Sequence, residues 1–282
     1  MQRSIGIVTD TTCSIPKELI DRFGIVEVPI NIQFGRHSYR EGEDMTPDEF
    51  YEQLEKGDMP TTSQPAPGDF IAAYQRLADK VQSIISIHVT GRSSGTVQAA
   101  RLASETMPHK EITVVDSGFT SMALGFMVLE AARHAMAGHS KEEVLAAIEG
   151  TRERIIPFMA VPTLEFLRKS GRVGTGMAVL GSLLAIKPIL SMKDGLVTAV
   201  DRVRTYPKAL HRLSELAEEA ARGHKVRLAV VYARMQDEAR QYCHRVQKRF
   251  HVVDEPIVSE IGAALAVHGG PGMMGIIIHK VD

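Results

Sequence analysis

Residues 83–116 read SIISIHVTGRSSGTVQAARLASETMPHKEITVVD, and this stretch decides the fold class. It predicts a buried strand over Ser83–Val89, a helix over Thr96–Thr106 and a second strand over Ile112–Asp116, because short β-branched runs flank a segment with helical spacing. A strand, a helix and a strand in this order are typical of a parallel β-sheet with helices packed on its faces.

The same alternation extends through the first half of the chain. A strand is predicted over Ser4–Val8 and an extended segment over Val26–Phe34, with helices over Pro16–Phe23, Asp48–Glu55, Gly68–Asp79, Ser121–Ala137 and Lys141–Arg154. We therefore expect residues 1–150 to form an N-terminal three-layer α/β domain with a parallel sheet.

The regular alternation of strands and helices ends in the second half, where strand patterns lie closer together and Lys193-Asp194-Gly195 indicates a hairpin turn. Helices are predicted over Thr163–Lys169, Tyr206–Arg222 and Asp237–Phe250. Strands are predicted over Ile155–Val161, Pro188–Ser191, Val197–Val200, Val203–Thr205, Arg227–Tyr232, Val252–Val258, Ala263–Val267 and Gly275–His279. This pattern favours a C-terminal α/β domain with a mixed or antiparallel sheet over residues 151–282.

Composition narrows the functional classes. The chain has 282 residues, of which 44% are apolar and 24% charged, with a formal net charge of -1, so it is typical of a globular protein and gives no support for nucleic-acid binding. We expect no signal peptide and no transmembrane helix, since no run of about 18 uncharged apolar residues occurs. Cys13 and Cys243 are the only cysteines and lack metal-ligand spacing, so we expect a cytoplasmic protein without a metal site.

Two hydroxyl-rich segments are candidates for ligand binding. In Pro60-Thr61-Thr62-Ser63-Gln64-Pro65, prolines restrict the backbone, so that the hydroxyls can point in fixed directions; the same letters also suit an ordinary proline-rich connector. Thr90–Thr96 joins a predicted strand to a helix, where α/β proteins place ligands and where the first helical turn offers unpaired N–H groups to an anion. The alternative is a structural N-cap at Ser94.

The third candidate is the segment His268–Gly275, which we place after a strand. Gly270–Gly275 matches the letters of GxGxxG, but too few residues follow for the helix, strand and acidic residue of a dinucleotide site. The glycines permit a close backbone approach, and His268 can donate a hydrogen bond to an anion; a structural histidine is the alternative. Arg172 and Arg204 lie in glycine- or turn-rich settings and suit phosphate contact or plain solvation. Cys13 suits a small apolar role better than a reactive thiol.

Together these motifs resemble the DegV family of bacterial fatty-acid-binding proteins over essentially the whole chain. The motifs that carry the resemblance are Val8–Thr12, Pro60–Pro65 with Gly68–Phe70, Ser86–His88 leading to Ser94–Thr96, Gly171-Arg172-Val173, Lys187–Leu190, Val203–Thr205, and His268 with Gly270-Pro271-Gly272 and Gly275.

The resemblance implies two α/β domains with one long-chain fatty acid in a tunnel between them, and no catalysis by the chain itself. Thr62, Ser94 and His268 would bind the carboxylate, supported by Ser63, Gly95, Thr96, Gly270 and Gly272. Arg172 and Arg204 would lie near the head group or the partner surface. The partner would be a separate fatty acid kinase of phospholipid metabolism. No other cofactor is expected, and we expect a monomer with at most transient contact with a membrane surface.

Two enzyme alternatives remain open from the residues. Ser94 or Ser63 with His268 and an aspartate would make a serine hydrolase of acyl esters, although the G-x-S-x-G elbow is missing. Distant kinship to dihydroxyacetone kinases would make the chain a kinase subunit, although it lacks a Walker-type loop. Turnover of an ester or binding of ATP separates these alternatives from a carrier.

Overall fold

The computed structural model describes residues 4–172 and 186–282. The chain divides into two compact units, the first made of residues 1–153 with Gly262–Ala264 and the second of residues 154–261 with 265–282. The α/β class predicted above is confirmed, with a parallel sheet in the first unit and a mixed sheet in the second.

The first unit is built on a four-stranded parallel sheet in the order β2-β1-β6-β7. Its strands are β1 (Ile5–Asp10), β2 (Val26–Val28), β6 (Ser83–His88) and β7 (Glu111–Asp116). All six residues of β1 and of β6 are buried, as expected for parallel strands covered on both faces.

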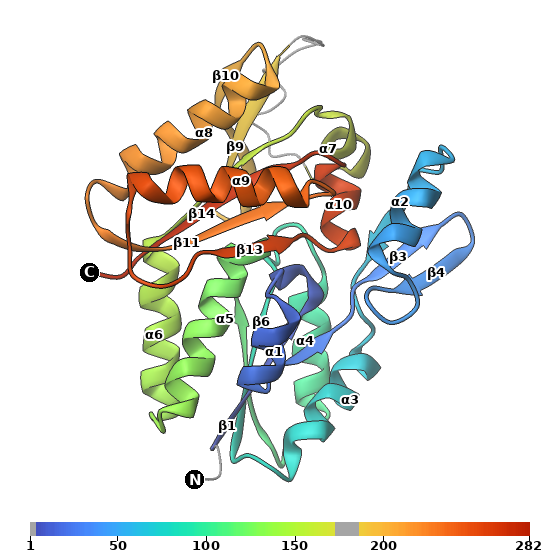
Figure 1. The fold of residues 1–282 in the computed structure, drawn as a ribbon. Coiled ribbons are helices and arrows are strands. Elements are labelled where there is room, and N and C mark those ends of the chain that lie inside the picture. The colour runs from blue at the N-terminus through green and yellow to red at the C-terminus, as the bar shows by residue number, and fades with distance from the viewer. Residues whose placement is uncertain (1–3, 173–185) are drawn as a thin grey trace. The chain divides into compact units, whose positions relative to one another are not determined.

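Helices cover both faces of this sheet (Figure 1). Helices α3 (Pro67–Ala78) and α4 (Thr96–Glu105) pack their apolar sides on one face, against Val8 and Ile84. Helix α5 (Ser121–Met136) packs on β1 and β6, with α1 (Lys17–Phe23) beside it. Helix α6 (Lys141–Arg154) follows α5 at the end of the first unit's main segment.

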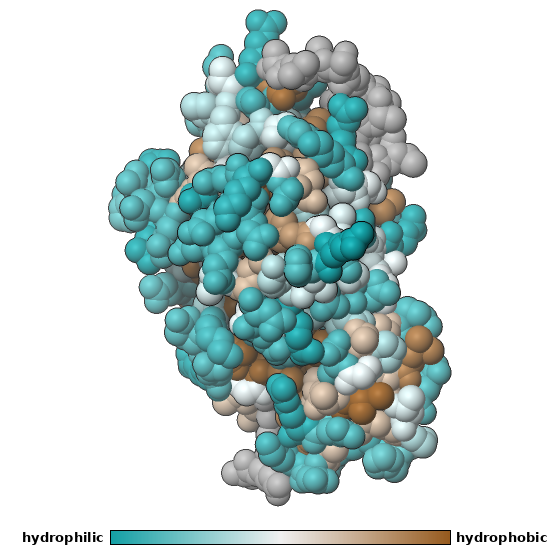
Figure 2. Space-filling view, turned by 90° about the vertical axis from the view of Figure 1, so that its right-hand side faces the viewer, coloured by the Kyte–Doolittle hydropathy of each residue, from teal (hydrophilic) through white to brown (hydrophobic). Residues whose placement is uncertain are grey.

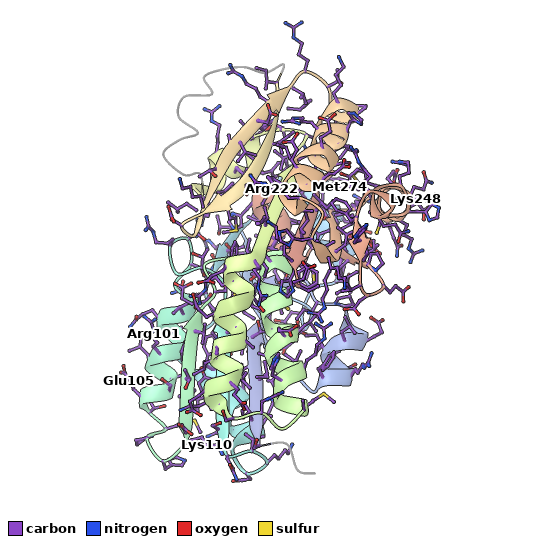
Figure 3. All side chains as sticks on the ribbon, turned by 90° about the vertical axis from the view of Figure 1, so that its left-hand side faces the viewer. Arg101, Glu105, Lys110, Arg222, Lys248 and Met274 are labelled. Carbon is purple, nitrogen blue, oxygen red and sulfur yellow. The ribbon has the colours of Figure 1, made fainter. Side chains whose placement is uncertain are left out.

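Helix α4 has the amphipathic pattern of a surface helix. Val97, Ala100 and Ala103 are buried, whereas Arg101 and Glu105 are exposed and project away from the sheet (Figure 3). The Lys110 ammonium group, just before β7, donates to the carbonyls of Ala78 and Val81 and so closes the end of α3.

A small antiparallel sheet in the order β4-β3-β5 extends the first unit. It contains β3 (Asn31–Phe34), β4 (His37–Arg40) and β5 (Thr61–Ser63), and α2 (Pro47–Glu55) precedes β5. Two predictions are corrected here. Val26–Phe34 is two strands rather than one extended segment, and the predicted connector at Thr61–Ser63 is itself a strand, because its backbone pairs with β3, a long-range contact that local sequence does not encode.

The second unit has a sheet in the order β10-β9-β8-β14-β11-β12, with β13 also paired to β11. The strands are β8 (Ile155–Ala160), β9 (Lys187–Lys193), β10 (Leu196–Val203), β11 (Lys225–Tyr232), β12 (His251–Val252), β13 (Ile257–Glu260) and β14 (Met274–Lys280). Strands β8, β9, β10, β11 and β14 pair antiparallel, while β12 and β13 run parallel to β11.

Helices α8 (Tyr206–Ala221) and α9 (Gln236–Val246) pack on one face of this sheet, and their core includes Leu213, Leu228, Val230, Ile276 and Ile278. Shorter helices of the described residues are α7 (Glu165–Ser170) and η3 (Gln247–Arg249) in the second unit, η1 (Thr11–Cys13) after β1 in the first, and α10 (Ala263–Gly269), whose first two residues belong to the first unit and the rest to the second.

Four strand predictions in the second half are corrected, one in its type and three in their bounds. Ala263–Val267 is the helix α10, because a short apolar run rich in alanine fits a buried helix as well as a strand. Val197–Val200 and Val203 belong to one strand, β10, which continues through an irregularity between Ala199 and Asp201, whereas Arg204 and Thr205 follow its end. Val252–Val258 is divided between β12 and β13.

The surface is dominated by polar groups on the face that Figure 2 shows. Among residues 4–172 and 186–282, the exposed large apolar side chains come singly from separate segments: Met59, Leu102, Met136, Val200 and Val253. Among the helices of the described chain, none combines the length and the apolar character needed to cross a bilayer.

Candidate functional site

The segment that holds Thr62 and Ser63 is fixed by β-sheet pairing. In β5, Thr62 lies opposite Ile32 of β3, and Thr61 lies opposite Gln33. The Gln33 amide donates to the Ser63 hydroxyl at 3.4 Å and accepts from the Thr61 hydroxyl at 3.1 Å. Since side chains alternate along a strand, Thr61 and Ser63 share the Gln33 face, and Thr62 points to the opposite face with the buried Ile32.

The segment that holds Ser94 starts the helix α4. The Ser94 hydroxyl is 2.8 Å from that of Thr96 and accepts from the Thr96 backbone N–H at 3.3 Å. The N-cap is Gly95, which has no side-chain capping bond, so the structural N-cap at Ser94 is corrected by one residue. Ser94 remains half-buried, and with Thr96 it forms a pair of hydroxyl groups at the helix N-terminus.

Gln64 brings these two segments together. A β-carbon at Gly95 would lie only 3.0 Å from the side-chain amide carbon of Gln64, so the absence of a side chain at Gly95 lets Gln64 pack on it. The Asn31 side-chain amide donates to the Gln64 carbonyl at 3.1 Å and holds the end of β5. Gln64 therefore packs the end of β5, which carries Ser63, against the start of α4 at Gly95.

The base of the Ser94 segment is held by two aspartates. The Asp10 carboxylate accepts from the Val89 N–H at 3.0 Å, at the end of β6. The Asp116 carboxylate, at the end of β7, accepts from the Gly91 N–H at 3.1 Å. A β-carbon at Gly91 would lie 2.8 Å from Asp116 Oδ2, which explains the glycine at this position.

Asp10 also begins a buried hydrogen-bonded chain that the sequence reasoning missed. Its Oδ2 is 3.0 Å from His88 Nδ1, His88 Nε2 is 2.6 Å from Ser86 Oγ, and Ser86 Oγ accepts from the Tyr74 hydroxyl at 3.0 Å. Burial raises the pKa of Tyr74 to about 12, so this phenol stays protonated. All four side chains are fully buried. The order of groups matches a serine hydrolase, but Ser86 has no access to a substrate, so the chain of bonds is structural.

The proposed histidine lies on α10 in the second unit. His268 is half-buried, and burial followed by the positive charge of Arg172 lowers its pKa to about 4, so the imidazole is neutral near pH 7. Arg172 is exposed and donates to the Ser170 carbonyl at 2.7 Å. Arg172 therefore acts electrostatically on His268, and its placement near a head group or a partner surface stays a prediction; Val173 of the same motif lies outside the described residues.

The glycines after His268 allow a tight turn. Gly270 has φ of 74° and Gly272 has φ of 80°, both in the left-handed region. A β-carbon at Gly270 would lie 2.4 Å from the Phe166 ring, and the Tyr206 hydroxyl donates to the Gly272 carbonyl. Arg204 is exposed, directly after β10. His268, Gly270 and Gly272 thus lie in and directly after α10, and Arg204 lies elsewhere in the same unit, after β10.

The described residues give little support for a serine hydrolase, a reactive cysteine or a metal site. The hydrogen bonds of the Ser94 hydroxyl within the described residues are both to Thr96, and none is to a histidine that could act as its base. Cys13 is buried, and its thiol donates to the Glu27 carboxylate at 3.5 Å. Burial together with that carboxylate raises the pKa of the thiol, which disfavours a reactive thiolate. In residues 4–172 and 186–282, no group of three or more His, Cys, Asp and Glu is placed to hold a metal ion.

Comparison with known proteins identifies the family of the chain. The family model described as "Uncharacterised protein, DegV family" matches residues 4–281. A DegV domain-containing protein of Streptomyces coelicolor is 36% identical over 279 residues, covering 99% of both chains. Protein DegV of Bacillus subtilis is 33% identical over 276 residues, covering 97% of this chain and 98% of the relative.

Solved structures of the same family share the fold of this chain. A DegV family protein from Thermus thermophilus, described for its fatty acid binding, superposes with a TM-score of 0.92 at 36% identity, covering 99% of this chain and 100% of the other. DegV from Bacillus subtilis, described as a fatty acid binding protein, superposes with a TM-score of 0.91 at 32% identity and the same coverage. On the sequence match and the shared fold, the chain belongs to the DegV family.

Proposed function

We propose that this protein is a carrier that binds one long-chain fatty acid, with the carboxylate held by Thr62, Ser94 and His268 and the acyl chain in an apolar tunnel between the domains 1–150 and 151–282. The observation that carries the proposal is the pair of hydroxyl groups at the start of α4, packed through Gln64 beside the Thr62 strand, in a chain whose solved relatives bind fatty acids.

The chemistry of the groups supports a carboxylate ligand. Hydroxyls and backbone N–H groups at a helix N-terminus favour an anion, and hydrogen bonds to a charged group contribute about 1.5–3 kcal/mol each. A neutral His268 can donate one ring N–H to the same carboxylate. The acyl chain adds roughly 0.8 kcal/mol for each methylene removed from water, so an apolar channel supplies most of the affinity.

Binding to variants tests the head-group assignment. The chain has no tryptophan, so displacement of a fluorescent fatty acid is read without interference from indole emission. We expect Ser94→Ala to weaken binding about tenfold or more. Ser93→Ala, in the same segment and half-buried like Ser94, is the matched control and should change affinity less than twofold. Equal affinity of the two variants would contradict the assignment.

We also propose that the bound acid is presented to a separate fatty acid kinase, and that the chain itself catalyses no reaction. Exposed Arg204 is a candidate contact with that partner. A purified fatty acid kinase with ATP should form acyl-phosphate only when this protein carries the acid, and Arg204→Glu should reduce the rate without changing fatty acid affinity. Ester hydrolysis by the chain alone would favour the hydrolase alternative instead.

A further inference from the structure

A second buried carboxylate, Glu41, has no role in the site described above. It follows β4 directly, and only 7% of its surface is exposed. Its backbone N–H donates to the Ile30 carbonyl at 3.0 Å, which fixes the residue at the end of the small sheet. A carboxylate in such a position requires a compensating set of donors, so its partners indicate what it does.

Glu41 joins the first βα loop to the start of α10. One carboxylate oxygen accepts from the Thr11 hydroxyl in η1, and the other accepts from the Ala264 backbone N–H at 2.8 Å. Thr11 Oγ1 in turn accepts from the Ile30 N–H at 3.1 Å. Ala264 lies in the first turn of α10, where backbone N–H groups have no partner within the helix.

Gly262 makes room for this contact. A β-carbon at that position would lie 2.2 Å from Glu41 Oε1, so any side chain would displace the carboxylate. Gly262–Ala264 belong to the first unit, whereas the rest of α10 belongs to the second. One short helix therefore begins where Glu41 holds it and carries His268 one turn later, since residues four apart lie on the same side of a helix.

We propose that Glu41 is a positioning residue for His268: by accepting from the first turn of α10, it sets where the histidine of the carboxylate site lies. This inference deepens the proposed function and rests on it for the role of His268. The contact itself stands on the bonds of Glu41, Thr11 and Ala264.

The charges around Glu41 make the contact sensitive to pH. Burial and the negative charges of Asp10 on β1 and Glu27 on β2 raise the pKa of Glu41, while the donors Thr11 and Ala264 lower it, and the result is a pKa of about 7. The carboxyl group therefore changes charge in the neutral range, although its contacts are all internal to the fold.

NMR of the lipid-free protein tests this contact without relying on fatty acid binding. With ¹³C-labelled histidine, the His268 resonance among the 11 histidines is assigned by its loss in His268→Gln. We expect the wild-type His268 resonance to shift near pH 7 as Glu41 titrates, and Glu41→Gln to abolish that step. Glu43→Gln, an exposed neighbour paired with Arg40, is the control and should keep it.

A second measurement addresses position. Glu41→Ala removes the acceptor of the Ala264 N–H, and Gly262→Ala displaces it, so both should move the His268 resonance and weaken fatty acid binding about tenfold, while Glu43→Ala should change neither. An unmoved His268 resonance in folded Glu41→Ala, or a step near pH 7 that survives Glu41→Gln, would overturn the inference. If the wild type binds no fatty acid, the proposed function fails while the resonance test still decides the role of Glu41.

Discussion

The two parts of the proposed site are shaped in opposite ways. The segments around Thr62 and Ser94 are held by polar side chains: Asp10, Asp116 and Asn31 each bond to backbone groups far away in sequence. The segment after His268 is shaped by missing side chains, since Gly270 and Gly272 take left-handed conformations under Phe166 and Pro162. The first part should therefore fail when a polar group is removed, and the second when a methyl group is added.

The largest effect is expected at Asp10, whose buried carboxylate accepts from Thr12, His88 and Val89. Asp10→Ala leaves several buried donors unsatisfied, so the free energy of unfolding should fall by about 3 kcal/mol or more. Urea unfolding measures the change. Asp79→Ala, at an exposed helix end, is the control and should cost less than about 1 kcal/mol. A small loss at Asp10 would show that these bonds do not hold the first loop.

The next effect is expected at Gly270. Gly270→Ala places a methyl group against the Phe166 ring in a left-handed conformation and should lower the free energy of unfolding by about 2 kcal/mol or more. Gly138 has φ of 84° with open space around it, so Gly138→Ala has the backbone strain alone and should cost about 1 kcal/mol. Equal losses in the two variants would mean that contact with Phe166 does not shape the turn.

A smaller effect is expected at Asn31. Asn31→Ala removes the bond to the Gln64 carbonyl, and a partly exposed hydrogen bond contributes about 1 kcal/mol. Fatty acid affinity should fall a few-fold because the Thr62 strand end loses its support, whereas Gln98→Ala on the exposed side of α4 should leave affinity unchanged. Calorimetric titration with palmitate distinguishes these outcomes.

The smallest effect concerns the charge beside His268. Arg172→Gln removes a positive charge that lowers the pKa of the imidazole, so this pKa should rise above about 4 while burial still keeps it below 6.5. Because the folded pKa is lower than the unfolded one, His268 contributes stability above pH 6.5 that is lost as the pH falls toward 4, and the variant should lose less. Histidine NMR and unfolding at pH 4 and pH 7 check both. An unchanged pKa of His268 in Arg172→Gln would show that the charge of Arg172 does not act on this imidazole.

Local sequence pattern predicts the elements that are bounded by clear turn or capping residues. The strands β1, β6 and β7 and the helices α4 and α5 follow from short apolar runs and helical spacing. The run Ala263–Val267 forms a helix and not the predicted strand, because five apolar residues in a row fit either a strand or a buried helix. Strand β5 was missed because its partner, β3, lies some 30 positions earlier in the chain.

The proposed site residues rest on family resemblance more than on chemistry. Motif order pointed to Thr62, Ser94 and His268, and spacing alone left each of them open to a structural interpretation. Asp10 with His88 and Glu41 with Ala264 are contacts between residues distant in sequence. Their only local signal was a polar residue within or beside an apolar strand, and that signal does not name a partner.

Analysis of the ligand that co-purifies with the protein tests the proposed fatty acid binding most directly. The protein, purified from cells grown in a medium without added lipid, should be denatured and its released small molecules analysed by mass spectrometry. We predict one long-chain fatty acid of 14 to 18 carbons, in nearly equimolar amount and reduced in the Ser94→Ala variant. Protein that releases no acyl chain, and that takes up none when fatty acids of these lengths are added, would contradict the account.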